Sequence, residues 1–164
     1  MSQTTLLRFL ILLSLTVWLG SLIFFPVVAQ AAFTVLPSSH LAGLVVRNSL
    51  IALHWMGLAA GIIFLACSML YNRVALGRAR IFALSHILVA LMLALTAISQ
   101  FTIIPRMDVL RLSVGELSAL PASNPMRAEF DSLHAWSTRV EMTVLAFGLV
   151  VLYSAAHDFS KSRP

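Results

Sequence analysis

The chain has 164 residues, of which 60% are hydrophobic and only 10% are charged. Its mean hydropathy is +0.95, whereas a soluble domain carries roughly 25% charged residues, so the composition excludes a soluble globular protein. The formal net charge of +5 does not indicate a nucleic-acid partner, because the arginines are scattered among apolar segments and form no basic run. The single cysteine, Cys67, excludes an intrachain disulfide and a CxxC metal site.

Four stretches are apolar and long enough for membrane-spanning helices, which need about 20 residues. They predict helices at about residues 6–33, 41–71, 79–104 and 126–156. We therefore predict an all-α fold, an integral membrane four-helix bundle that forms a single domain over residues 1–164. The lipid bilayer is its expected surroundings.

The first stretch resembles a secretory signal, with Arg8 before an apolar run and Ala29-Gln30-Ala31 after it. The apolar core of a signal peptide covers roughly 7–15 residues, and the run over residues 9–28 is longer. We therefore expect this segment to be retained as the first helix.

The connections carry helix-start signals. Ser38 or Ser39 is the predicted N-cap of the second helix, and Asn124-Pro125 predicts the start of the fourth. Between the third and fourth helices, apolar residues recur at helical spacing, which predicts a short amphipathic helix on the membrane surface. These residues are Met107, Leu110, Val114 and Leu117.

The basic residues predict the orientation, since cytoplasmic loops are enriched in Lys and Arg. The side with both termini and the second link would hold six basic residues and Asp158. The other side would hold four basic and four acidic residues, namely Arg47, Arg106, Arg111, Arg127, Asp108, Glu116, Glu129 and Asp131. We therefore expect both termini to be cytoplasmic.

The stretch "IALHWMGLAAG" places one imidazole, His54, within an apolar helix. His54, Gly57 and Gly61 follow at helical steps and share one face. Gly57 and Gly61 form a GxxxG pattern, which lets another helix approach closely. We therefore predict that His54 points into the bundle. Trp18 and Trp55 are also expected to pack between helices.

Ionisable groups at membrane depth are candidates for functional sites. With a rise of about 1.5 Å per residue, His54, Gln100 and Glu141 lie at similar depth in the outer leaflet, and His86 lies in the inner one. The predicted outer-leaflet polar site comprises His54, Gln100, Arg106, His134, Ser137 and Glu141.

Three interpretations of this site remain open. Its side chains can hydrogen-bond across helices and only fix the packing. They can instead handle a proton or a metal such as copper, since imidazole and the nearby methionines suit that metal. Finally, His54 and His134 can ligate haem b. No HExxH motif or acyl-transfer arrangement is present, so the sequence does not indicate an enzyme.

Four segments together resemble a known family: "VWLGSLIFFPVVAQAAF", "HLAGLVVRNSLIALHWMGL", "FTIIPRMDVLR" and "FDSLHAWSTRVEM". They are similar to small bacterial membrane proteins grouped with eukaryotic transmembrane protein 205, a domain of unknown function. The resemblance covers most of residues 15–148. The matching positions are Trp18, Gly20, Pro26, Phe33, Gly43, His54, Gly57, Pro105, Arg106, Phe130, His134 and Ser137.

The resemblance implies a compact four-helix domain in the bacterial inner membrane but supplies no reaction, protein partner or oligomeric state. Glu141 stands where many members of that group have a neutral residue, which argues against a shared role for it. A looser similarity to copper-resistance and haem-synthesis membrane proteins is an analogy of architecture alone.

Overall fold

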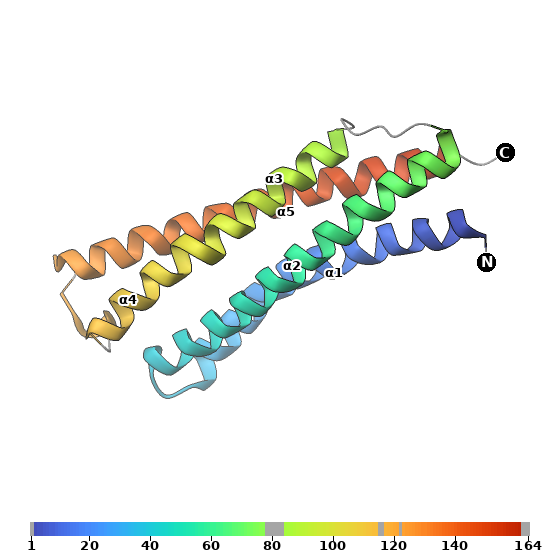
Figure 1. Cartoon of the computed structure of the whole chain (residues 1–164). Helices are drawn as coiled ribbons and strands as arrows, with labels where there is room; N and C mark the ends of the chain where they lie inside the picture. The colour runs from blue at the N-terminus through green and yellow to red at the C-terminus, as the bar shows by residue number, and fades with distance from the viewer. Residues whose placement is uncertain (1, 78–83, 115–116, 122, 162–164) are drawn as a thin grey trace.

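The computed structural model describes residues 2–77, 84–114, 117–121 and 123–161. Within them lie four helices that are long and apolar enough to cross a membrane, over Gln3–Val35, Ser39–Ala75, Leu84–Val114 and Pro125–Asp158. The chain is thus an all-α four-helix bundle, as predicted (Figure 1). The first five residues of the predicted third helix, 79–83, lie outside the described part.

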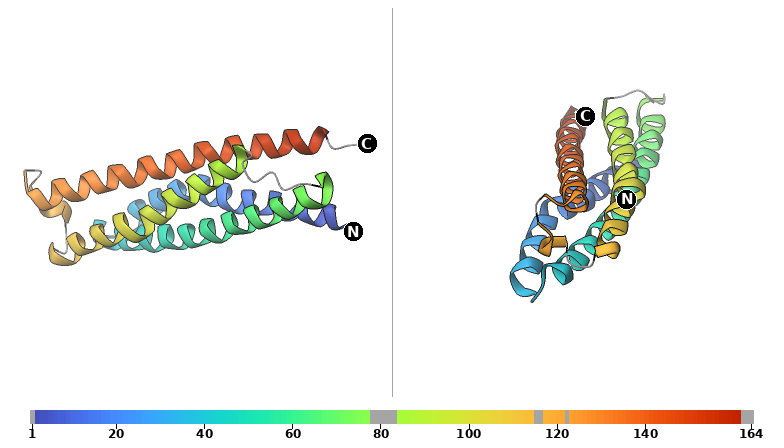
Figure 2. Two further views of the ribbon diagram at one scale, coloured as in Figure 1. Left: turned by 45° about the horizontal axis from the view of Figure 1, so that its top comes forward. Right: turned by 90° about the vertical axis from the view of Figure 1, so that its left-hand side faces the viewer.

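Two hairpins make up the bundle. Helices α1 (Gln3–Val35) and α2 (Ser39–Leu76) form the first. In the second, α3 (Leu84–Ile98), η1 (Ser99–Ile103) and α4 (Ile104–Val114) run in line, and α5 (Pro125–Lys161) returns beside them, after the short η2 (Leu117–Ala119). The first residues of α1 and the last residues of α5 lie at the same end of the bundle, here called the terminal end (Figures 1 and 2).

The helix starts follow the predicted capping chemistry. Ser38 is the N-cap of α2, and its side chain accepts a hydrogen bond from the Leu41 backbone N–H at 3.2 Å. At α5, the Asn124 side-chain oxygen accepts from the backbone N–H of Met126 at 2.9 Å, and Pro125 occupies the first turn. Both signals are confirmed because each satisfies an N–H that has no partner inside its helix.

The prediction of a separate surface helix between the third and fourth membrane helices is wrong. Residues Ile104–Val114 form a helix, but this α4 continues directly from α3 through a π-helical turn. In that turn the Ile104 N–H donates to the Ser99 carbonyl, five residues earlier. The wider turn accommodates Pro105, which has no N–H to donate and would otherwise clash with the preceding turn.

Small residues set the closest approaches between helices. Trp18, only 1% exposed, packs against α2 where Gly57 and Gly61 lie, and a Cβ at either glycine would overlap its ring. At Gly148 of α5, a Cβ would overlap Leu19 of α1. Trp55 is different from the prediction: it is 54% exposed and meets Phe101 edge-on, at the outer surface of the bundle.

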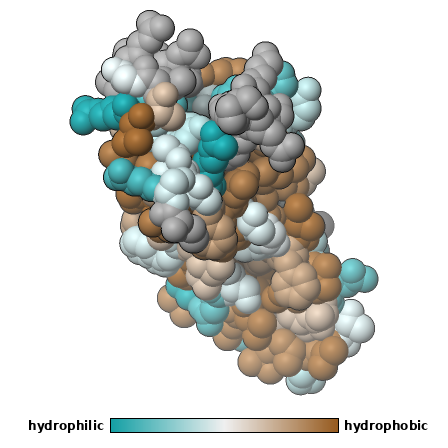
Figure 3. Space-filling model, turned by 90° about the vertical axis from the view of Figure 1, so that its right-hand side faces the viewer, coloured by the Kyte–Doolittle hydropathy of each residue, from teal (hydrophilic) through white to brown (hydrophobic). Residues whose placement is uncertain are grey.

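The outer surface is the one expected for contact with lipid. Large apolar side chains such as Phe24, Ile62 and Tyr153 are more than half exposed, and apolar residues make up much of the lower part of the face in Figure 3. In water such a surface would be costly. The helices, 33 to 38 residues for α1, α2 and α5, are also longer than a bilayer core of about 30 Å requires.

Candidate functional site

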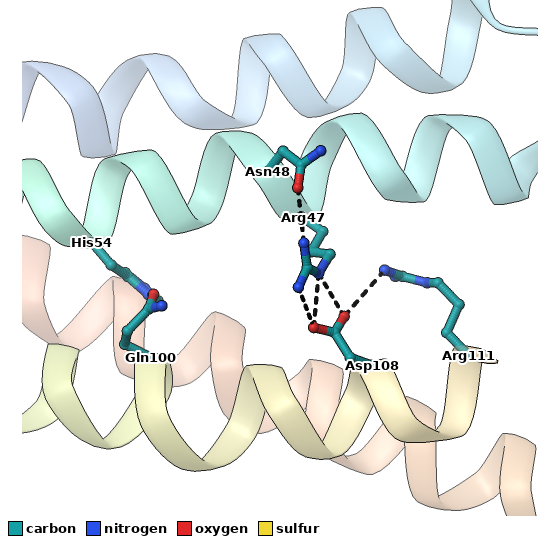
Figure 4. A network of polar contacts seen from close by, with 6 residues as sticks. All are labelled: Arg47, Asn48, His54, Gln100, Asp108 and Arg111. Atoms are coloured by element: carbon teal, nitrogen blue, oxygen red, sulfur yellow. Dashed lines mark hydrogen bonds and ion pairs between the residues drawn. The ribbon is translucent and has the colours of Figure 1, made fainter. Parts of the chain in front are cut away.

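The π-helical turn places Gln100 opposite His54. His54 of α2 is fully buried, and its Nδ1 lies 2.9 Å from the Gln100 Oε1 (Figure 4). Its other ring nitrogen, Nε2, lies 2.7 Å from Oε1 of Glu141 on α5. A π turn shifts the register of the side chains that follow it and is frequent at functional sites. Three helices thus meet at one imidazole.

This His54–Gln100–Glu141 cluster is complete with its proton in either of two positions. If both ring nitrogens donate, His54 is an imidazolium and Glu141 a carboxylate, so the pair is neutral overall. If Glu141 carries the proton instead, it donates to Nε2 of a neutral ring. In both cases one proton lies in the contact between Nε2 and Glu141, and Nδ1 donates its own proton to Gln100. Neither ring nitrogen is left without a partner.

Among the described residues, the other predicted site residues form no hydrogen bond or ion pair with this cluster. His134 is exposed on α5, seven residues from Glu141 and thus about 10 Å along the helix. Both ring nitrogens of His54 have other partners, so His134 is not bonded to His54. Arg106 donates to Glu129 at 2.7 Å on the surface. Ser137, only 5% exposed, lies about one turn from Glu141.

His86 is separate, as its depth predicted. It lies on α3, and its Nε2 is 2.9 Å from the hydroxyl of Ser68. That hydroxyl donates to the Leu65 carbonyl at 3.1 Å, so the ring acts as the donor to Ser68. Its Nδ1 is buried without a partner.

A second polar cluster lies seven residues before His54 on the same face of α2. Arg47 binds the carboxylate of Asp108 on α4, with Nε 2.7 Å from Oδ1 and 2.8 Å from Oδ2. Arg111 reaches the same carboxylate at 3.9 Å, with its side chain 13% exposed. Figure 4 shows both guanidinium groups on either side of Asp108.

Sequence reasoning did not assign Asp108 and Arg111 to a site. A signal was available, since Arg47 shares a helix face with His54, and Asp108 and Arg111 are three residues apart on one helix. It was insufficient because Pro105 indicated that the third helix ends before them.

A groove of about 610 Å³ connects the two clusters. Its walls are apolar and come from α1, for example Phe25, Pro26 and Ala29, and from α5, for example Met142 and Leu145. Its polar lining consists of Arg47, Asp108, Arg111, His134, Ser137, Thr138 and Glu141. Helices α1 and α5 draw apart away from the terminal end (Figures 1 and 2).

These features define a multi-pass membrane protein with buried polar groups beneath a largely apolar groove. Residues 13–113 match the family described as Domain of unknown function (DUF4149), and the chain belongs to this family. That match ends before α5, which supplies Glu141. Comparison with curated proteins and with solved structures gives no match.

Proposed function

We propose that the chain is a non-enzymatic ligand-binding protein of the bacterial inner membrane, in which His54 and Glu141 share a proton beneath the ligand groove. One observation carries the proposal: the carboxyl group of Glu141 both bonds to the buried ring of His54 and lines the groove. A charge at membrane depth is costly unless it is paired. A shared proton keeps the floor of the groove neutral while leaving Glu141 in reach of a ligand.

The geometry favours this proposal over a metal or haem site. Both ring nitrogens of His54 already have partners, so ligation would require one of these hydrogen bonds to break. A metal held by both His54 and His134 would need ring nitrogens about 4 Å apart, given metal–nitrogen bonds of about 2 Å. His134 instead lies seven residues from Glu141, about 10 Å along α5 from the residue that meets His54. Among the described residues, no three His, Cys, Asp or Glu side chains form a metal-binding group. We also propose that the chain belongs with the small bacterial relatives of transmembrane protein 205, a resemblance that implies no cofactor.

Exchange of Glu141 tests the shared proton. In protein labelled with ¹⁵N-histidine and reconstituted in lipid, we expect His54 to appear as an imidazolium, or a protonated carboxyl band to appear in the infrared spectrum. Glu141→Gln should leave a neutral His54 ring or remove that band, because no carboxyl group remains to share the proton. The signal of His54 is identified by its loss in His54→Gln.

A neutral His54 together with no protonated carboxyl band in the unmodified protein would contradict the proposal. The same preparation distinguishes the alternatives by its absorption spectrum and metal content. A Soret band, or near-stoichiometric copper, that disappears in His54→Ala would replace the shared proton with a cofactor.

We further propose that both termini face the cytoplasm, which the distribution of basic residues supports. Arg8 and Arg73 lie toward the terminal end, on helices α1 and α2, whereas Arg78, Arg80, Glu116 and Arg163 lie outside the described residues. A green fluorescent protein fused to the C-terminus should therefore fluoresce, and an alkaline phosphatase fusion there should be inactive. Active phosphatase with no fluorescence would reverse the orientation.

A further inference from the structure

The groove has the shape of a site for a lipid chain. Its lining comes from α1, α2, α4 and α5, and the side formed by α1 is apolar throughout, with Phe25, Pro26 and Ala29 among its residues. A volume of about 610 Å³ lies within the range of roughly 300–1,000 Å³ that ligand sites occupy. On α1, large apolar residues that alternate in sequence with the lining residues are exposed, for example Phe24 and Val27. A chain in the groove would therefore leave it directly into the membrane.

The charged residues of the groove at the end away from His54, namely Arg47, Asp108 and Arg111, favour an anion. Arg47 and Arg111 share the single carboxylate of Asp108, so this cluster carries one net positive charge. The net charge of the whole groove rests on the proposed function, because His54 and Glu141 are neutral together only if they share a proton. A positive charge that lines an apolar groove is complementary to a ligand with one negative group.

Arg111 has donors to spare for that ligand. Arg47 is held on one side by three contacts with Asp108, from its Nε and Nη2, and on the other by Asn48, whose side-chain oxygen accepts from its Nη1 at 2.9 Å. The guanidinium of Arg111 is 3.9 Å from Asp108, beyond hydrogen-bonding distance, and lies over the ring of Phe130 at 5.5 Å. Gly43 provides room beside it, since a Cβ there would lie 3.3 Å from its Nη2.

The depth of the arginines also matches a lipid headgroup. Arg47 lies eight residues from the start of α2, about 12 Å along the helix, and α2 is about 57 Å long by the same rise. Because the helix exceeds the bilayer core of about 30 Å, residues near its start belong to the headgroup region. His54 lies a further seven residues inward, beside the chains.

We propose that the groove binds an acidic phospholipid, with its phosphate on Arg111 and one acyl chain between α1 and α5. Guanidinium groups suit phosphate because they donate two parallel hydrogen bonds. The proposed order along the groove is thus phosphate at Arg111, chain along the apolar walls, and the neutral His54–Glu141 pair at the floor.

Native mass spectrometry of the detergent-purified protein tests this proposal. The probes are phosphatidylglycerol and phosphatidylcholine with identical acyl chains. Both lipids carry the phosphate, but only phosphatidylcholine adds a cationic choline beside the arginines. We therefore expect phosphatidylglycerol to bind at least about tenfold more tightly. Arg111→Gln should remove this preference. Arg106→Gln is the matched control, because Arg106 lies on the same helix but pairs with Glu129 outside the groove.

A second variant tests the chain-binding part with the charge intact. Ala29→Trp fills the groove from α1, and we expect about a tenfold loss of phosphatidylglycerol binding. Circular dichroism and the unfolding midpoint show whether each variant is folded, and Ala29→Trp keeps the test available if Arg111→Gln does not fold. Glycerol phosphate without acyl chains should not compete.

Equal retention of the two lipids by the unmodified protein would overturn the proposal. It would also be overturned if Arg111→Gln retained the preference, or if glycerol phosphate displaced the lipid, which would indicate a soluble anion. A failure of lipid binding with a normal response of His54 to Glu141→Gln would remove only this inference. The reverse pattern would remove only the shared proton.

Discussion

Gly57→Ala is expected to destabilise the protein by about 1–3 kcal/mol, the range for overpacking a close-packed interior. A Cβ at this position would lie 2.8 Å from Cε2 and 2.9 Å from Cδ1 of Trp18, so the ring or the helix must move. Trp18 has little room for this because it is 1% exposed and also packs against Gly61. The interface between α1 and α2 would therefore open. The measurement is the free energy of unfolding in mild detergent. Unfolding is monitored through the reaction of Cys67 with a fluorogenic thiol dye.

Gly20→Ala is the matched control. Gly20 lies in α1, two residues from Trp18, and a Cβ there would meet nothing within 4 Å. The substitution should be neutral or stabilise the helix by up to about 1 kcal/mol, because alanine has the higher helix propensity. In a Trp18→Ala background the cost of Gly57→Ala should fall. If the two glycine variants were equally stable, the close contact of Trp18 with Gly57 would be refuted.

His54→Ala is expected to cost about 3 kcal/mol. It removes the contacts to Gln100 and Glu141 and leaves a carboxyl group and an amide without their partner in the bundle. Interhelical hydrogen bonds in membranes contribute only about 0.6 kcal/mol each, so two lost bonds do not account for this value. The larger part comes from the carboxyl group left without a partner and from the cavity. Unfolding free energies measured as for the glycine variants test this.

The control for this substitution is His134→Ala. His134 is the same residue type in the same groove, but it is exposed and not bonded to His54, so the change should stay within about 0.5 kcal/mol. Combining His54→Leu with Glu141→Leu should recover most of the loss, since an apolar pair replaces an ionic one at little cost. Equal effects of His54→Ala and His134→Ala would show that the cluster contributes no special stability.

Much of the fold follows from local sequence features. The length and composition of the four apolar stretches are sufficient for four helices, because a lipid-exposed backbone must satisfy its own hydrogen bonds. The caps at Ser38 and Asn124 were readable because each involves residues only a few positions apart. Pro105 misled the prediction, since a π turn absorbs the missing N–H, and no local pattern distinguishes that outcome from a helix end.

For the candidate site, the sequence by itself determined which residues share a depth. The rise per residue placed His54, Gln100 and Glu141 together and His86 apart, and helical spacing placed Gly57 and Gly61 on the face of His54. The sequence did not determine how the helices turn about their axes or how far they spread. Only the tertiary structure decided that Glu141 faces His54 while His134 does not, that Arg47 meets Asp108, and that α1 and α5 leave a groove. Such contacts join residues 46 to 87 positions apart, and they depend on how side chains interlock across helices, which no periodicity within one helix contains.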